Sequence, residues 1–358
     1  MNLLRHSMVR PRAFGYALAM ATSLCVLMGV GDSAESNRVS FIDTHAHLNV
    51  APRKGRVSFS DYERAATNAL SIMDGLGIQK TFLMPPPVHP LSPRRGEEKD
   101  LREITKSHPQ RFAFLGGGGT LNPMIQEAVQ AGRLTAEMQN VFEALAHEIV
   151  QSGAVGFGEL TAEHLSFRQD HPYESAPPDH PLLLRLAEIA ARHNMPIDLH
   201  MEAVASDMAI PGHVFSPNNP TTLRSNITAF ERLLAHNRNT VIVWAHAGWD
   251  NTGGRTVSLI RSLVEKHPNL YMSVKVDRQS LSENRPVAAG KIRPEWIDLV
   301  RSFPSRFMIG ADEHFGVSEQ TSRGVGRAKA ARLFLDQLPE DLALKVGYEN
   351  ALRIYRLR

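Results

Sequence analysis

Cysteine is nearly absent from this sequence, which has one among its 358 residues, Cys25. That residue lies in an N-terminal segment that we expect to be removed, so the mature chain would contain none. The scarcity excludes disulfide bonds, cysteine-ligated zinc and a thiol nucleophile from the function. An oxidising compartment would therefore do the chain no harm.

An excess of charge of one sign is also missing. Forty Lys and Arg residues against 37 Asp and Glu residues give a formal net charge of +3 at pH 7. Three arginines and one aspartate in residues 1–34 account for +2 of it, which leaves about +1 for the remainder. Such a balance gives no electrostatic basis for binding nucleic acid, and we predict a small-molecule substrate instead.

Long apolar runs are limited to one, AFGYALAMATSLCVLMGV at 13–30. Arginines precede this run and small residues follow it, which is the layout of a secretory signal, so we predict a leader over 1–34 and one domain over 35–358. The run is at the lower limit for spanning a membrane, so an uncleaved anchor is the alternative. Its richness in Ala, Gly and Ser favours cleavage and export to the periplasm or the exterior. Membrane contact is expected only through a retained leader.

A glycine-rich phosphate loop, internal repeats and low-complexity segments are lacking too, which argues against a dinucleotide-binding fold. Instead, apolar strand-like runs alternate with helical patterns. The eight strand candidates are 39–48, 80–85, 112–117, 154–160, 196–201, 240–246, 270–276 and 306–313. Helical patterns cover 61–76, 97–107, 136–151, 182–194, 224–237, 255–267, 294–302, 319–337 and about 340–355. Eight β/α alternations predict a (β/α)8 TIM barrel.

The connections between these elements differ in length in a way that supports a barrel. Links from helix to strand are short, whereas links from strand to helix are long, as in 161–181, 202–223 and 277–293. In a barrel the long loops collect at the carboxyl ends of the strands, where active sites form.

Histidines occur twice in the first strand candidate, in FIDTHAHL at 41–48. Alternate side chains of a strand share a face, so His45 and His47 project together, as two metal ligands would. Further acidic or imidazole side chains lie at the carboxyl ends of other strand candidates: Glu159, His200, His246 and Asp312. Unpartnered buried charges are costly, so this set predicts a metal site at that rim of the barrel.

Residues 39–358 resemble the amidohydrolase superfamily, in particular its amidohydrolase 2 branch. That branch includes aminocarboxymuconate-semialdehyde decarboxylase, resorcylate decarboxylases and pyrone-dicarboxylate lactonase. The motifs that carry the resemblance are DTHAHL, DLH, WAHAG, GADEH and NALRIY. The resemblance implies that His45, His47, His200 and Asp312 bind a divalent metal, commonly zinc. It also implies that His246 faces the substrate or binds a second metal.

Glu159 departs from the simplest mononuclear pattern of that branch. Its GFGEL segment is similar to the fourth-strand glutamate of the superfamily's metal-dependent deoxyribonucleases, which bridges two metals. Glu159 is thus either a bridging ligand, with His200 and His246 completing a second centre, or a residue that orients a ligand histidine. One metal ion and two are both compatible with the sequence.

Four further residues are candidates for contacting the substrate. Lys275 and Arg278 follow the seventh strand and could bind an anionic group. Trp249 follows the sixth strand and His314 lies two residues after Asp312, so either side chain could line the pocket. By contrast, the histidines in helix-to-strand turns are expected at the opposite end of the barrel, in structural roles: His108, His193, His236 and His267.

The leading hypothesis is a metal-dependent hydrolase that directs water onto an ester, lactone, amide or similar bond. In this hypothesis Asp312 takes the proton of that water and passes it to the leaving group, while His246 polarises the bond under attack. A decarboxylase on the same scaffold is the first alternative. A non-catalytic binding protein is the second. The sequence gives no prediction of the oligomeric state.

Overall fold

The computed structural model describes residues 38–50, 58–92, 97–322 and 326–357. The predicted leader at 1–34 lies outside the described residues, so its prediction stays untested. Among the described residues, no helix combines the length and the apolar character needed to cross a membrane.

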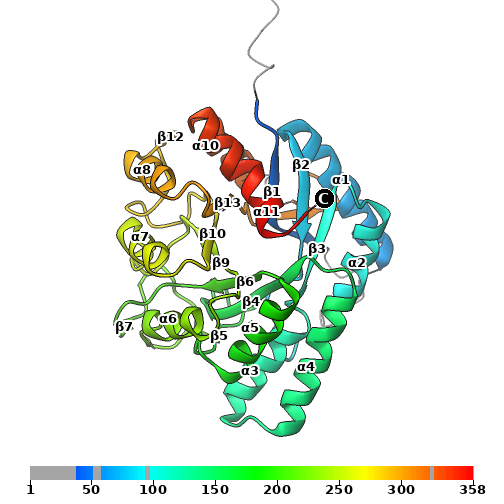
Figure 1. Cartoon of the computed structure of the whole chain (residues 1–358), viewed down its shortest axis with the longest axis vertical. Coiled ribbons are helices and arrows are strands. Elements are labelled where there is room, and N and C mark those ends of the chain that lie inside the picture. Colours follow the sequence, from blue (N-terminus) through cyan, green and yellow to red (C-terminus); the bar gives the residue numbers. More distant parts are fainter. Residues whose placement is uncertain (1–37, 51–57, 93–96, 323–325, 358) are drawn as a thin grey trace, which may run out of the picture. The chain divides into compact units, whose positions relative to one another are not determined.

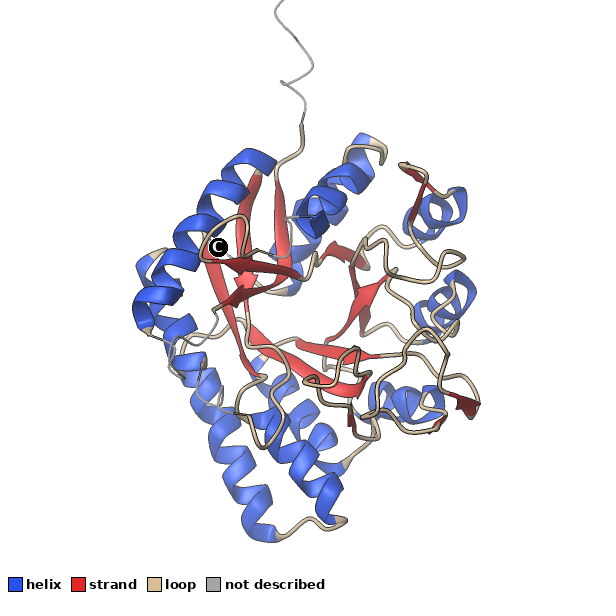
Figure 2. Ribbon diagram, turned by 180° about the vertical axis from the view of Figure 1, so that it is seen from behind, coloured by secondary structure: helices blue, strands red, loops and turns tan. Residues whose placement is uncertain are grey.

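Parallel strands form a closed ring with eight places, one of which β13 and β14 share, and this confirms the predicted (β/α)8 barrel. The ring runs β13–β10–β9–β6–β4–β3–β2–β1 and closes where β13 and β14 both pair with β1. Helices surround it on the outside (Figure 2). Its strands are β1 (Phe41–Asn49), β2 (Ile78–Leu83), β3 (Phe112–Gly117), β4 (Gly156–His164), β6 (Ile197–Met201), β9 (Ile242–Ala247), β10 (Leu270–Val274), β13 (Phe307–Ile309) and β14 (Glu313–Gly316).

The helices follow the predicted segments closely, with one addition. They are α1 (Phe59–Leu76), α2 (Glu98–Ser107), α3 (Leu121–Ala131), α4 (Ala136–Gln151), α5 (Pro181–His193), α6 (Ile227–His236), α7 (Val257–Lys266), α8 (Pro294–Ser302), α9 (Gly326–Leu335), α10 (Glu340–Leu344) and α11 (Asn350–Ile354), with a π-helical turn at Lys345–Glu349 between the last two (Figure 1). The sequence did not predict α3, because a run of glycines and an internal proline obscured its helical pattern.

Helix α1 illustrates how local sequence sets these boundaries. Ser58 and Asp61 form a capping box at its start, and Gly77 ends it in the left-handed conformation, with φ of 69°. Between these ends, Ala65, Ala69 and other small or apolar side chains recur three and four positions apart and are buried. The helix therefore presents one face to the barrel and begins and ends at residues suited to each role.

The predicted strand at 306–313 was wrong in one respect, because the chain leaves the sheet in the middle of it. β13 ends at Ile309, and β14 starts at Glu313. Between them, Asp312 adopts a left-handed backbone conformation with φ of 55°. The break lets the segment pair twice with β1 and directs Asp312 toward the barrel axis. The predicted helix at 319–337 also starts later, at Gly326.

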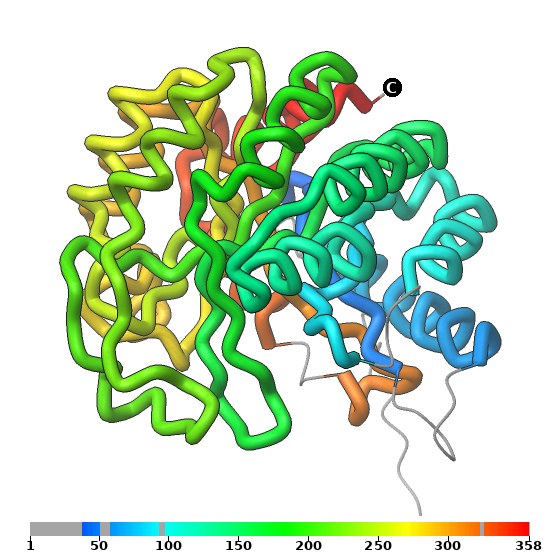
Figure 3. The backbone as a smooth tube through the Cα atoms, turned by 90° about the horizontal axis from the view of Figure 1, so that it is seen from below, coloured from blue at the N-terminus to red at the C-terminus, as the bar shows by residue number. Residues whose placement is uncertain are grey.

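The loops at the carboxyl ends of the barrel strands contain short antiparallel strand pairs. β5 (Glu174–Ser175) pairs with the end of β4, while β7 (Met208–Ala209) pairs with β8 (Thr222–Leu223), and β11 (Val287–Ala288) pairs with β12 (Lys291–Ile292). The loops after β4, in green, and after β6, in yellow-green, project from the same side of the molecule (Figure 3). These loops build walls around the carboxyl ends of the strands.

The apolar core has two main layers. The larger one lies between the strands and the surrounding helices, and includes Phe157 and Trp244. The smaller one fills the barrel interior with side chains such as Phe82 and Val243, and Tyr355, which follows the last residue of α11, packs against Phe82. One end of the barrel is thereby closed by packed apolar side chains, which leaves the carboxyl end for polar groups.

Candidate metal centre

His45 and His47 lie on β1 with their second ring nitrogens already engaged. The Nδ1 atom of His45 lies 3.2 Å from an oxygen of Asp198, and Nδ1 of His47 lies 2.9 Å from the carbonyl oxygen of Met84. Both Nε2 atoms therefore point the same way, toward the carboxylate of Glu159. A histidine fixed at one nitrogen offers the other as an oriented ligand.

Glu159 lies in the middle of four histidines. Its Oε2 atom is 3.5 Å from Nε2 of His45 and 3.4 Å from Nε2 of His47. Its Oε1 atom is 2.8 Å from Nδ1 of His200 and 3.1 Å from Nε2 of His246. Each carboxylate oxygen thus faces its own pair of imidazoles. This division of one carboxylate between two pairs is what a group bridging two cations requires.

His45, His47 and Oε2 of Glu159 form a first group of donor atoms. Asp312, which lies far along the chain, completes this group. Its Oδ1 atom is 3.3 Å from Nε2 of His47 and 4.0 Å from Nε2 of His45, and its backbone N–H donates to the carbonyl of His45. His246 has φ of 67°, a left-handed conformation that non-glycine residues seldom adopt, as does Asp312. Such backbone strain collects at functional sites, where the surrounding fold holds it in place.

The donor atoms fit a divalent cation at the first group. Nε2 of His45 is buried without a hydrogen-bond partner, although carboxylate oxygens lie 3.5 and 4.0 Å away. Two ligands about 2.1 Å from a tetrahedral ion lie about 3.4 Å apart, which is close to the observed spacings. His45, His47, Glu159 and Asp312 would supply four ligand atoms.

The second group has three donors, from Glu159, His200 and His246. Their distances of 2.8 and 3.1 Å are hydrogen-bond lengths, so this group is more tightly closed than the first. All three side chains are buried. Three protein ligands leave room for water or substrate on a catalytic ion.

The pKa shifts of His45 and Glu159 share one cause, which is the attraction between the imidazoles and carboxylates of this site. Burial disfavours the charged imidazole of His45, but Asp198 and Glu159 outweigh it and raise its pKa well above the usual value. Burial would raise the pKa of Glu159, but His45 and the other imidazoles hold it well below. Protons on His45 and His47 occupy positions that a cation could take, so metal binding there should release protons.

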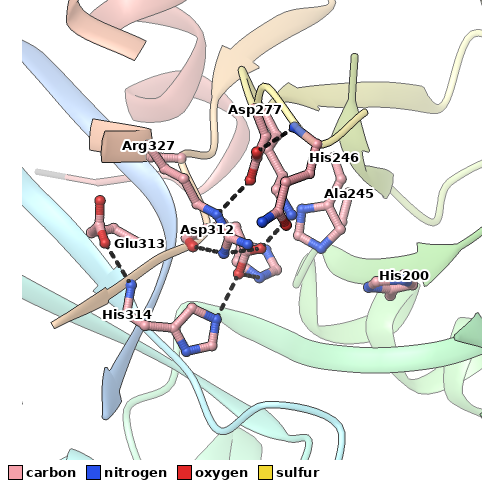
Figure 4. A network of polar contacts seen from close by, with 12 residues as sticks. His200, Ala245, His246, Asp277, Asp312, Glu313, His314 and Arg327 are labelled. Carbon is pink, nitrogen blue, oxygen red and sulfur yellow. Dashed lines mark hydrogen bonds and ion pairs between the residues drawn. The ribbon is translucent and has the colours of Figure 1, made fainter. Parts of the chain in front are cut away.

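A pair of cations fixes the outer oxygen of Asp312. Nζ of Lys275 is 2.6 Å and a guanidinium nitrogen of Arg327 is 2.8 Å from Oδ2, while Arg327 also bonds Asp277 (Figure 4). Burial favours a protonated Asp312, but Lys275 and Arg327 keep its pKa well below the usual range. The aspartate is therefore ionised, with Oδ1 directed at the histidines.

The four predicted substrate-contact residues occupy different positions around this centre. His314 lies 3.3 Å from Oδ1 of Asp312. Lys275 is buried rather than free, with its ammonium 3.9 Å from the centre of the Trp249 ring. Arg278 is exposed and lines the outer part of the cavity above the site. Their contact with a substrate stays a prediction.

Several residues of the site escaped the sequence analysis. Asp198 and Glu202 flank His200 on the same face of β6 and its extension, an alternation that could have indicated them. Glu202 accepts a hydrogen bond from Asn251 and lies 3.9 Å from Nε2 of His200. Arg327 had a weaker signal: a cation in the first turn of α9 opposes the helix dipole and so calls for an acidic partner.

The four histidines predicted in helix-to-strand turns all lie at the ends of helices. His108 and His267 cap α2 and α7, and His193 and His236 are the last residues of α5 and α6. His164, in contrast, lies at the end of β4 with its ring 4.5 Å from that of His200. It therefore belongs to the surroundings of the centre.

Comparison with known proteins places this architecture in a family. A family model described as Amidohydrolase (Amidohydro_2) matches residues 42–357. A comparison with curated proteins finds none that matches the sequence.

Solved structures with the same fold are distant in sequence. A 4-oxalomesaconate hydratase from Rhodopseudomonas palustris superposes with a TM-score of 0.52 at 12% identity, over 88% of this chain and 95% of that one. A 2,6-dihydroxybenzoate decarboxylase from Rhizobium has a TM-score of 0.50 at 13% identity, over 89% and 99%. At such identities the likeness concerns the fold, whereas the family model covers nearly all of the barrel. The chain belongs to the amidohydrolase family of enzymes, in its amidohydrolase 2 branch.

Proposed function

We propose that this protein is a hydrolase in which Glu159 and the histidines around it would hold two divalent ions, and which directs water onto an ester, lactone or amide bond. The observation that carries the proposal is the division of the Glu159 carboxylate between His45 and His47 on one oxygen and His200 and His246 on the other. A residue that only oriented a single histidine would not need to face four of them.

The chemistry is divided between the ions and the surrounding side chains. A divalent cation supplies Lewis acidity, which makes water nucleophilic at neutral pH and polarises the bond under attack. Oδ1 of Asp312 is placed to accept the proton of the attacking water, because Lys275 and Arg327 occupy its other oxygen. His314, 3.3 Å from Oδ1, is placed to carry that proton on to the leaving group.

Zinc is the ion we propose, because imidazole nitrogens and carboxylate oxygens are its usual ligands and three or four of them satisfy it. We also propose that the N-terminal segment directs export, since the sequence has the layout of a secretory signal. Neither the decarboxylase nor the binding-protein alternative requires a carboxylate shared between two groups of histidines.

The test begins with a count of metal ions per chain by elemental analysis. We expect two, bound with unequal affinity, because the first group is spaced for an ion and the second is closed by hydrogen bonds. Glu159→Gln should retain at most one ion. Glu163→Gln, on the same strand but bonded to Tyr173 and Ser175, is the matched control and should retain two.

Product analysis then separates the reaction classes. We expect the metal-loaded protein to hydrolyse members of a panel of esters, lactones and amides. Release of carbon dioxide from aromatic acids, without hydrolysis, would favour the decarboxylase. A chain that takes up no divalent ion would contradict both enzymes and favour a binding protein.

A further inference from the structure

A large cavity opens from the metal centre to the surface. Its volume is about 1870 Å³, whereas pockets for small ligands usually hold about 300–1,000 Å³. His47, Glu159 and Asp312 belong to its lining, so the centre forms its floor. A substrate no larger than a single ring would leave most of this space filled with water.

The walls of the cavity carry apolar side chains on several sides. Val88 and Leu91 follow β2, and Phe167 and Trp249 follow β4 and β9. Val287 of the β11 hairpin and Leu333 of α9 line it as well. Apolar side chains therefore occur both near the centre and at the rim.

Three of these side chains are exposed in a way that large apolar residues seldom are. Leu91 is 88% exposed, and Phe167 and Leu333 are each 42% exposed. They are three of the seven exposed large hydrophobic side chains in the part of the chain that the structure describes. Apolar side chains gathered around the mouth of a catalytic pocket mark a surface that a ligand covers.

Three charged side chains of the cavity lining lie exposed at its mouth. Those of Arg168 and Lys329 are each 59% exposed, with acidic neighbours at Asp170 and Glu319. Arg278 is exposed as well. These three side chains are solvated, so the exposed apolar side chains of the mouth are available for contact with a ligand.

We infer that the substrate carries a long aliphatic chain, with its scissile carbonyl at the metal centre and its chain along the apolar wall of the cavity. The inference rests on the proposed hydrolase function and names the substrate class of that site: acyl esters, acyl amides or alkyl-substituted lactones. Burial of each methylene stabilises the complex, so specificity should rise with chain length.

The experiment measures kcat/KM of the metal-loaded protein for unbranched 4-nitrophenyl esters from acetate to decanoate, below their aggregation limits. We expect an increase of up to about fourfold per methylene over the first several carbons. Leu333→Gln combined with Leu91→Gln should flatten that dependence. Leu344→Gln, with a leucine 41% exposed on α10 and absent from the cavity lining, is the matched control and should keep the slope.

Binding measured without turnover separates this inference from the proposed function. Straight-chain methyl ketones from 2-butanone to 2-decanone resemble the esters and are not hydrolysed, and their affinity by calorimetry should rise with length. If affinity rises but no ester, lactone or amide is cleaved, the hydrolase proposal fails and the inference stands. If short esters are cleaved as well as long ones and ketone affinity is independent of length, the inference is overturned while the hydrolase remains.

Discussion

The two ring nitrogens of His45 have different roles: Nδ1 bonds to Asp198, and Nε2 faces the metal ligands. Asp198 determines which nitrogen has which role. Asp198 is fully buried on β6, 3.2 Å from Nδ1 of His45. A carboxylate at this position holds the proton on Nδ1, so Nε2 is the nitrogen that would give up its proton and direct its lone pair at an ion in the first group of ligands.

Asp198→Asn should weaken metal binding by about 10- to 100-fold, because the amide holds the imidazole less firmly and makes it less basic. Competition with a chromogenic chelator measures the affinity. His108→Ala, at the far end of the barrel, is the control and should bind metal and turn over substrate normally. If His108→Ala lost as much as Asp198→Asn, the assignment of the two ends of the barrel would be wrong.

Glu174 is a buried carboxylate with an unusual pKa. Its Oε2 atom has no hydrogen-bond partner, and Oε1 has a long contact of 3.4 Å with Asn122. Burial raises the pKa of Glu174 from 4.5 to about 7. The folded protein therefore binds this proton more tightly than the unfolded chain does.

The contribution of Glu174 to the free energy of unfolding should accordingly fall as the pH rises from about 4.5 to 7, because its carboxyl group must ionise inside the folded protein. Glu174→Gln removes that cost and should raise the free energy of unfolding by about 1–3 kcal/mol at pH 8, with little effect near pH 4.5. Urea unfolding at both values measures it. Glu148→Gln, at an exposed position on α4, should leave the free energy of unfolding unchanged at both pH values. If Glu174→Gln raised that free energy equally at pH 4.5 and pH 8, Glu174 would not have the raised pKa.

Metal-ligand candidates were predictable from sequence where they alternate on a strand or end one. His45 and His47 stand two apart, and His200 ends an apolar run. Arg327 lies fifteen residues beyond Asp312 along the chain, and only the fold brings its guanidinium back to that carboxylate. A contact of this kind depends on where α9 docks, which local pattern does not determine.

At the scale of elements, α2 supports the turn that follows β3. An oxygen of Glu98, the first residue of α2, accepts hydrogen bonds from the backbone N–H groups of Gly117 and Gly119 and from the hydroxyl of Thr120. A Cβ atom at Gly118 would lie 2.5 Å from the carbonyl oxygen of Pro85, so the turn also needs glycine there.

Glu98→Ala should lower the free energy of unfolding by about 2–3 kcal/mol, because three donors lose a charged acceptor. Glu103→Ala is made in the same helix at an exposed ion pair with Lys106, and should cost under about 1 kcal/mol. Chemical denaturation of both variants gives the comparison. Equal losses would mean that Glu98 contributes only to the helix.

Most elements were predictable because apolar periodicity and short helix-to-strand links repeat along the chain. The failures occur where the backbone departs from regular structure. At Gly310–Asp312 the chain leaves the sheet, and the sequence there still reads as a continuous strand. Only Thr120 separates the start of helix α3 from four glycines, and Pro123 in the first turn of α3 resembles a loop residue.

At the scale of the whole molecule, the centre joins strands from all around the ring. Its candidate ligands come from β1, β4, β6, β9 and the segment after β13. A bound ion therefore opposes opening of the barrel at several places at once.

Removal of metal with a chelator should lower the melting temperature by several degrees, and restored metal should recover it, since an ion present at a thousand times its Kd stabilises the folded state by about 4 kcal/mol. Differential scanning calorimetry measures the shift. His47→Ala removes a ligand of the first group only, so its melting temperature should shift less with the chelator than that of the wild type. If the chelator left the melting temperature of the wild-type protein unchanged, a bound metal ion would be ruled out.

Barrel closure could be predicted from the number of alternations, but the way in which the ring closes could not. The backbone N–H of Asp312 donates to the carbonyl of His45, and Thr44 bonds the carbonyl of Ile309, 265 positions along the chain. During synthesis the ribosome therefore releases the first histidines long before their aspartate partner exists. The barrel can close only after the last quarter of the chain has been made, so an ion held by the first group of ligands would be captured late in maturation.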